Sequence, residues 1–152
     1  MRVVPSRGFT LVELMVTLAL IAILAVMAVP SFSSFIANQQ VKTASYDLLA
    51  ALNFARSEAI KRNQDVTVAA VDDDWVAGWE VTSEDGVLKV WDAPGDLDFG
   101  DSPTSFTYLP NGRVSGGLSA AVSVCKSAAT RRIVNVDMSG HARLSRSGAC
   151  SE

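Results

Sequence analysis

The stretch "SRGFTLVELMVTLALIAILAVMAVPSF", residues 6–32, decides the fold of the first part of this chain. It begins with a serine, a basic residue and a glycine, and then runs almost wholly apolar to Pro30. The apolar run 9–29 has 21 residues. At about 1.5 Å per residue, a helix of that length spans a bilayer. One carboxylate, that of Glu13, lies near the start of the run.

Basic residues flank the run on one side. Arg2 and Arg7 precede it and the next base is Lys42, so the positive-inside rule predicts a cytoplasmic N-terminus. A cleaved secretory signal would have a shorter apolar region with no acid in it. A plain signal anchor explains the length and the basic flank, but it does not explain Glu13.

The residues "RGFTLVELMVTLALIAIL" resemble the N-terminus of type IV pilins and type II secretion pseudopilins. In these proteins a short basic leader ends in glycine, phenylalanine usually follows, and the fifth mature residue is glutamate. Gly8, Phe9 and Glu13 match this pattern. Pro30 matches a proline found partway down the apolar helix of the family. The resemblance implies that a prepilin peptidase cleaves between Gly8 and Phe9 and methylates the new N-terminus.

The resemblance also suggests a partner for the glutamate. A carboxylate in hydrocarbon costs several kcal/mol unless it is paired or protonated. Cleavage would create an amine on Phe9, about one helical turn before Glu13. In pilins the glutamate is thought to neutralise this amine, in its own or a neighbouring subunit, as the subunit enters the filament. We therefore expect Glu13 to act in assembly with other pilins and minor pilins, not in catalysis.

Beyond Pro30 a helical pattern resumes. Apolar residues recur every three or four positions, as in a helix with one face on a core. They are Val41, Ala44, Leu48, Leu52, Ala55 and Ala59. Polar residues, Glu58 among them, fall elsewhere around the helix. We expect the helix to end near Arg62–Asn63. Because only a proline kink separates its halves, one helix of about 55 residues is predicted.

The remaining chain reads as short strands separated by turn signals such as "EDG" and "PNG". The predicted strands are 66–71, 78–82, 87–91, 105–109, 120–125 and 131–137. Their connections are too short for βαβ crossovers, so we expect antiparallel pairing and an α+β fold. The three tryptophans fall in or beside these strands and are expected in the core or on a sheet face.

Three further stretches resemble the GspH/FimT group, which contains minor pilins and a minor pseudopilin of type II secretion. They are "LLAALNFARSEAIKRNQDVTV", "YLPNGRVSGG" and "RRIVNVDMSGHARL". The resemblance implies a pilin-like fold, in which the C-terminal half of a long N-terminal helix packs on an antiparallel β-sheet head. The expected division is a cleaved leader (1–8), a transmembrane or filament-core half-helix (9–29), an amphipathic half-helix (30–63) and a β-rich head with a basic tail (64–152).

The same division of the chain predicts where the protein is found in the cell. The precursor is expected in the bacterial inner membrane, crossing it once, with its N-terminus in the cytoplasm and its head in the periplasm. After processing, the subunit is expected in the pilus fibre at the cell surface. The alternative is the type II secretion machine, where the partners would be other pseudopilins and secreted proteins and no DNA would be bound.

The net charge of −3 combines two regions of opposite sign. Between Asp65 and Asp101, eleven acids accompany one base, a balance of −10. From Arg113 to Glu152, six bases accompany two acids, a balance of +4. A chain that is acidic in the middle and basic at its end can bind a polyanion locally although its total charge is negative.

No enzyme signature is present in the sequence. The single histidine, His141, excludes HExxH-type zinc chemistry, and neither GxSxG nor GxxxxGKS occurs. The acidic runs 72–75 and 95–101 do not have the residue spacing of an EF-hand calcium loop, with its glycine and terminal glutamate, so we expect a solvated acidic surface there. We therefore expect a non-enzymatic protein with no cofactor and no bound metal.

The C-terminal run "SGHARLSR" resembles a short Gly-Arg-x-Arg motif by which FimT-type proteins of competent bacteria bind DNA for uptake. Gly140 and Arg143 match its first and last positions, whereas His141 replaces the first arginine. Histidine is mostly neutral near pH 7, which weakens one phosphate contact. The other bases expected to take part are Arg146, Arg131, Arg132 and Lys126.

In this interpretation Gly140 lets the chain turn so that Arg143 and Arg146 project together. A neighbouring strand with Arg131 and Arg132 supplies a second row. The competing interpretation is a solvated basic edge strand that resists aggregation.

The two cysteines, Cys125 and Cys150, both lie in the C-terminal part. Two cysteines and one histidine are too few for a zinc site. In an exported domain they are expected to form a disulfide, whereas in a cytosolic chain they would more often stay reduced. Whether the N-terminal segment directs export therefore determines whether the two cysteines are expected to be bonded or reduced.

Overall fold

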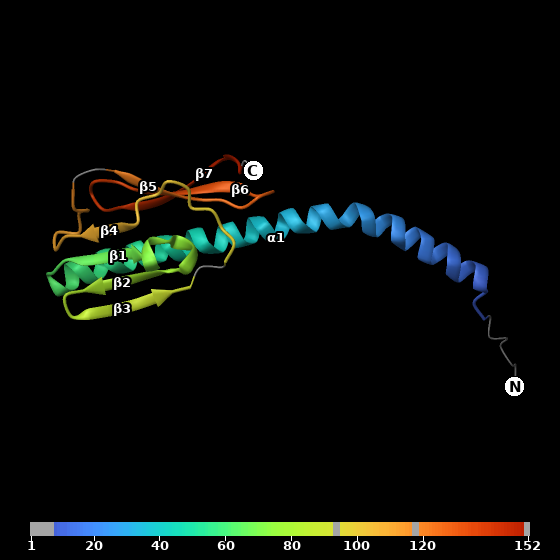
Figure 1. Ribbon diagram of the computed structural model, residues 1–152, viewed down its shortest axis with the longest axis horizontal. Coiled ribbons are helices and arrows are strands. Elements are labelled where there is room, and N and C mark those ends of the chain that lie inside the picture. Colours follow the sequence, from blue (N-terminus) through green and yellow to red (C-terminus); the bar gives the residue numbers. More distant parts are fainter. Residues whose placement is uncertain (1–7, 93–94, 117–118, 151–152) are drawn as a thin grey trace, which may run out of the picture.

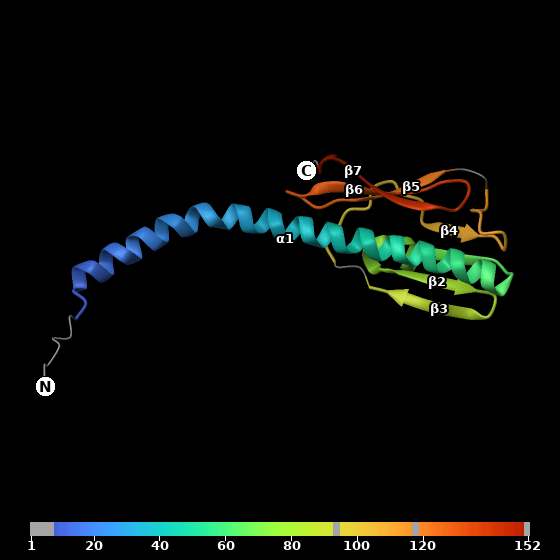
Figure 2. The same cartoon turned by 180° about the vertical axis from the view of Figure 1, so that it is seen from behind.

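The computed structural model describes residues 8–92, 95–116 and 119–150; within them, the side chains of 26–31 are not described. The fold is α+β. A long helix, α1 (Leu11–Arg62), projects from a head in which its C-terminal half packs on two antiparallel sheets (Figures 1 and 2). This arrangement confirms the predicted fold class. The predicted leader lies outside the described residues up to position 7.

Helix α1 has 52 residues and begins and ends at recognisable caps. The Thr10 hydroxyl accepts a hydrogen bond from the Glu13 backbone N–H at 3.2 Å, which places Glu13 in the first turn. Asn63 ends the helix in the left-handed conformation (φ 55°), so the predicted end is confirmed. The helical backbone continues through Pro30, and Figure 2 shows the ribbon bending between the two halves. A proline lacks the N–H of an interior helical residue and commonly causes such a bend.

The head contains two sheets. The larger has the strand order β3-β2-β1-β4 and the smaller the order β5-β6-β7. The strands of the larger sheet are β1 (Val66–Ala70), β2 (Trp79–Ser83), β3 (Gly86–Trp91) and β4 (Ser105–Tyr108). Those of the smaller sheet are β5 (Ala120–Val124), β6 (Thr130–Val136) and β7 (Ala142–Ala149). Two short 3₁₀ helices, η1 (Val71–Asp73) and η2 (Trp75–Ala77), join β1 to β2.

The six predicted strands are confirmed, and all pairings among them are antiparallel. Strand β7 was not among the predicted strands. Its sequence, "ARLSRSGA", is polar and contains a glycine, so it lacks the β-branched and aromatic residues that signal a strand. Antiparallel pairing with β6 along its whole length holds it in the sheet.

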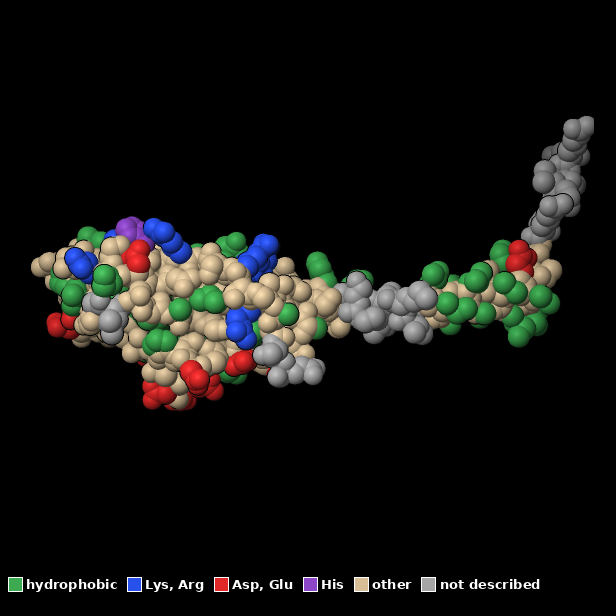
Figure 3. Space-filling model, turned by 90° about the horizontal axis from the view of Figure 1, so that it is seen from above, with side chains coloured by type: hydrophobic (Ala, Val, Ile, Leu, Met, Phe, Trp, Pro, Cys, Tyr) green, Lys and Arg blue, Asp and Glu red, His purple; other side chains and the backbone are tan. Residues whose placement is uncertain are grey.

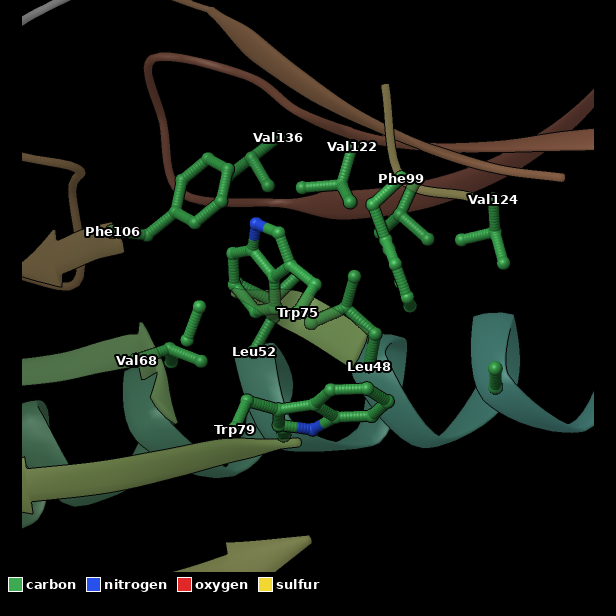
Figure 4. Close-up of a cluster of buried hydrophobic side chains, with 14 of the residues drawn as sticks. Leu48, Leu52, Val68, Trp75, Trp79, Phe99, Phe106, Val122, Val124 and Val136 are labelled. Carbon is green, nitrogen blue, oxygen red and sulfur yellow. The ribbon is translucent and has the colours of Figure 1, made fainter. Parts of the chain in front are cut away.

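The core lies between the two sheets and the second half of α1. The six apolar helix residues predicted to face a core are fully buried there. Trp75 and Trp79 are also buried and approach Phe99 and Phe106 between the layers (Figure 4). The Trp75 indole N–H donates to the Pro103 carbonyl at 2.9 Å, which satisfies its polar atom. The expected core position of these tryptophans is therefore confirmed.

Glu58 lies away from the predicted apolar face of α1 and is nevertheless buried. Its carboxylate accepts hydrogen bonds from Arg62 Nε at 2.6 Å and from Lys61 Nζ at 3.3 Å. The Arg62 bond, together with the Lys61 bond and both positive charges, lowers the pKa of Glu58 despite its burial. Residues three and four positions apart meet on one side of a helix, so this cluster forms locally.

Candidate functional site

The first half of α1 exposes a continuous apolar surface. Phe9, Leu11 and Leu24 are 74%, 73% and 66% exposed. The large apolar side chains between them are exposed as well: Val12, Leu14, Met15, Val16, Leu18, Leu20, Ile21 and Ile23. Leaving so much apolar surface in water is unfavourable. Among the described residues, no helix has a stretch that is long and apolar enough to cross a membrane.

The Glu13 carboxylate has no ion-pair partner among the residues that the structure describes. The Glu13 backbone N–H is bound to Thr10. The first turn of a helix favours a negative charge because of the helix dipole. The charge of Glu13 is therefore available to a group from outside the described residues.

Strand alternation separates the basic residues of β6 and β7. Arg143 and Arg146 are three positions apart on β7, so their side chains lie on opposite faces of the sheet. Arg131 and Arg132 are adjacent on β6 and also point to opposite faces. The prediction that Arg143 and Arg146 project together is therefore wrong, because an odd spacing on a strand inverts the side chain.

The pairing register instead brings Arg132 and Arg146 directly opposite each other. They lie on the sheet face that carries Leu144 and Val134, toward α1. The guanidinium carbon of Arg132 lies 5.8 Å from the centre of the Tyr46 ring on α1. Neither arginine forms an ion pair with a described carboxylate. Like charges directly opposite on neighbouring strands repel, and an anion between them removes that repulsion.

The other face of the small sheet carries a hollow. Ala121, Asn135 and Arg143 face one another in a row across the three strands. They line a pocket of about 320 Å³. Its remaining lining residues are Ser119, Ala120, Val136, Asp137 and His141. His141 and Arg143, both predicted from the sequence, therefore lie at one site.

The turn between β6 and β7 has a dense hydrogen-bond network. Asp137 Oδ1 accepts bonds from the Ser139 hydroxyl, the Ser139 N–H at 2.9 Å and the His141 N–H at 3.0 Å. The Ser139 hydroxyl bond, and then these N–H bonds, lower the pKa of Asp137. Ser139 Oγ also lies 2.8 Å from His141 Nδ1. The network fixes the turn that carries His141.

Gly140 and Arg56 dock this turn on the rest of the head. Gly140 has a φ of 81°, and a Cβ there would lie 2.0 Å from the Gly112 carbonyl oxygen. Arg56 of α1 donates to the Gly112 carbonyl at 2.9 Å and to the Ser139 carbonyl at 3.2 Å. Gly140 therefore allows both the left-handed turn and the close approach of this turn to the Gly112 carbonyl. Sequence reasoning did not single out Arg56, because only the fold brings both turns to α1.

The predicted disulfide between Cys125 and Cys150 is confirmed, with an S–S distance of 2.07 Å. It ties the end of β7 to the end of β5. Lys126 is brought near the tail as expected, since its N–H lies 3.3 Å from Cys150 Sγ. Its ammonium, however, forms an ion pair with Asp96 at 3.0 Å, so its charge is partly neutralised.

On the face of the head that Figure 3 shows, most of the visible Lys and Arg side chains and the histidine lie along one edge, and most of the visible acidic groups lie along the opposite edge. The segment between Asp65 and Asp101, with its eleven acids, forms mainly the larger sheet and its loops. Among the described residues, no group of three or more His, Cys, Asp or Glu side chains is placed to hold a metal ion.

Comparison with known families assigns the chain. A model described as "Type II transport protein GspH" matches residues 44–140, more than half of the chain. The prokaryotic N-terminal methylation motif matches residues 5–29. The chain belongs to the GspH family. No curated protein sequence matches it.

Two crystal structures of the type IV minor pilin FimU from Pseudomonas aeruginosa share the fold of this GspH-family chain. One is 22% identical with a TM-score of 0.60, and the match covers 72% of this chain and 99% of the crystallised FimU chain. The other is 20% identical with a TM-score of 0.63, and the match covers 77% of this chain and 99% of the crystallised FimU chain. The methylation motif and the family together imply processing by a prepilin peptidase and assembly with other pilins.

Proposed function

We propose that this GspH-family protein is a minor subunit of a type IV pilus, at or near its tip, where it primes assembly. Residues 1–8 are the leader, and cleavage after Gly8 leaves Phe9 as the methylated N-terminus. Residues 9–29 then lie first in the inner membrane and later in the filament core. Two observations support this role: the exposed apolar surface of α1, and a Glu13 carboxylate that pairs with no described residue.

We further propose that the head binds DNA without sequence preference, for uptake in natural transformation. The observation that carries this proposal is the Arg132–Arg146 pair, two cations directly opposite each other with no described carboxylate partner. Strand β7 is an edge strand, so side chains from both of its faces flank the edge. Arg143 lies about 10 Å along the strand from Arg146 and extends the basic surface to the other face.

The test is DNA binding by a soluble fragment that begins near Ser31, measured at several salt concentrations. All buried residues that the structure describes lie at or beyond Ala37, so this fragment retains the core. About four phosphate contacts give a log–log slope of about −3 to −4 on duplex DNA. Arg146→Ala should weaken binding to every sequence and reduce that slope by about one.

Two further variants sharpen this test. Lys89→Ala removes the same charge from β3 in the acidic sheet and should leave the isotherm nearly unchanged. His141→Arg restores the Gly-Arg-x-Arg motif and places a permanent positive charge in the turn before Arg143, so it should strengthen binding. Absence of binding at low salt, or an unchanged isotherm for Arg146→Ala, would leave the protein as an assembly subunit only.

The second candidate is a minor pseudopilin of a type II secretion system. The observation that favours it is the description of the matching family model as a type II transport protein. Deletion of the gene distinguishes the two roles. Loss of pili and of DNA uptake supports the pilus subunit, whereas loss of protein secretion with normal pili supports the pseudopilin.

A further inference from the structure

We propose that the pocket on the outer face of the small sheet receives one unpaired base of single-stranded DNA, with Arg143 at the adjacent phosphate. This inference rests on the proposed DNA binding and specifies its preferred form. Single-stranded DNA should bind more tightly than duplex DNA of the same length, because a duplex keeps its base edges paired and stacked.

The shape of the pocket favours a single small ring system. The row Ala121, Asn135 and Arg143 crosses the three strands, and the short Ala121 side chain lies at its β5 end. Its volume of about 320 Å³ is at the small end of the range for ligand pockets, roughly 300–1,000 Å³. The pocket also lies beside the β7 edge, so a single DNA strand held at that edge by Arg146 can place a base in the pocket.

Hydrogen bonds within the turn set the chemistry of His141. The Asp137 carboxylate is an acceptor, so the Ser139 hydroxyl donates its proton to Asp137. The Nδ1 atom of His141 must then donate to Ser139 Oγ. In the neutral ring, Nε2 is therefore an acceptor. This tautomer follows from the network of donors and acceptors.

Asn135 also contributes an acceptor. Its amide nitrogen donates to Ser145 Oγ at 2.9 Å and to the Ile133 carbonyl at 3.3 Å. This leaves its Oδ1 atom without a described donor. With one cation, Arg143, and acceptors on Asn135 and His141, the pocket matches a group that combines a phosphate with an amino-bearing base.

These donors and acceptors predict a base preference. Cytosine, adenine and guanine carry an exocyclic amino group, whereas thymine carries none. We therefore expect oligo(dC) to bind more tightly than oligo(dT) of equal length, by about fivefold or more.

The experiment compares oligo(dC), oligo(dT) and a duplex of the same length on the full chain in detergent, at pH 7.5 and one salt concentration. Ala121→Leu fills the pocket with an exposed side chain. It should reduce oligo(dC) affinity to the oligo(dT) level and leave duplex affinity within about twofold. Ser147→Leu introduces a leucine on the same face of the small sheet but on β7, opposite Arg131 and outside the pocket, and should change none of the three affinities.

The results separate this inference from the function on which it rests. Equal affinities for oligo(dC) and oligo(dT), unaffected by Ala121→Leu, overturn the base pocket while duplex binding upholds the DNA role. No binding of single strands or duplex at low salt overturns both. The comparison of oligonucleotides on the unaltered chain needs no variant, so it decides the question even if Ala121→Leu proves unstable.

Discussion

The two halves of α1 are both rich in apolar residues, but only one of them is covered. In the second half, Val41, Leu48 and Leu52 are 0% exposed beneath the sheets. In the first half, Leu18, Leu20 and Ile21 are 57%, 57% and 60% exposed. Burial of apolar surface supplies most of the free energy of folding. The second half is therefore stabilised by its own chain, whereas the first half needs a lipid or protein partner.

The two glutamates of the same helix differ in the same way. Glu58 is buried and bound by Arg62 and Lys61. Glu13 is exposed, and no described residue pairs with it. One carboxylate is bound within the head, and we propose that the other acts in assembly.

Processing of the first half should be blocked completely by Gly8→Tyr. The peptidase of this family cuts after a glycine, so a bulky residue there should leave the full-length precursor in the inner membrane. Intact-mass measurement of the unaltered protein should find a methylated Phe9 at the mature N-terminus. A mature chain that begins after Ala28 or later would instead indicate an ordinary secretory signal.

Assembly should fall strongly in Glu13→Ala, without loss of the head fold. Removal of a charge from an apolar run makes membrane insertion easier, so insertion and cleavage should continue. Incorporation into filaments, measured by immunoblotting of sheared pili, should drop because the Phe9 amine has lost its partner. Wild-type incorporation of this variant would show that Glu13 pairs with nothing during assembly.

Leu52→Ala should lower the free energy of unfolding of the head by about 2–5 kcal/mol, because it leaves a cavity in the core. Leu20→Ala makes the same change in the uncovered half and should leave that free energy unchanged within about 0.5 kcal/mol. Denaturant unfolding of the detergent-solubilised chain, followed by tryptophan fluorescence, measures both. Equal effects of the two substitutions would remove the distinction between the halves.

Glu58→Gln should have the smallest effect, and that effect should depend on pH. The Arg62 hydrogen bond holds the pKa of Glu58 below its usual 4.5. A lowered pKa stabilises the fold above the unfolded-state value, and this stabilisation is lost as the pH falls through the folded-state value. The difference in melting temperature between variant and wild type should therefore be present at pH 7 and shrink below about pH 4.5. A difference independent of pH would show that the ion pair does not stabilise the head.

Sequence reasoning located most of the elements because their signals are local. The spacing of Val41, Leu48 and Leu52 identified a helix face, and "QDVTV" with its flanking turns identified a strand. Gly8, Phe9 and Glu13 are contiguous enough for a motif to recognise them. Strand β7 was missed, because its stability comes from pairing with β6 and from the disulfide, neither of which a polar sequence reveals.

The α+β class, the apolar segment with its glutamate, the basic C-terminal part and the pair of cysteines can all be read from the amino-acid sequence alone. The tertiary structure decided which arginines meet. Residues next to each other on a strand point to opposite faces, so Arg143 and Arg146 separate while Arg132 and Arg146 come together. It also decided the pocket at Arg143 and the anchoring of Gly140 on Arg56 and Gly112. These contacts join residues that are far apart in the chain. Which residues meet depends on the register in which whole strands pair.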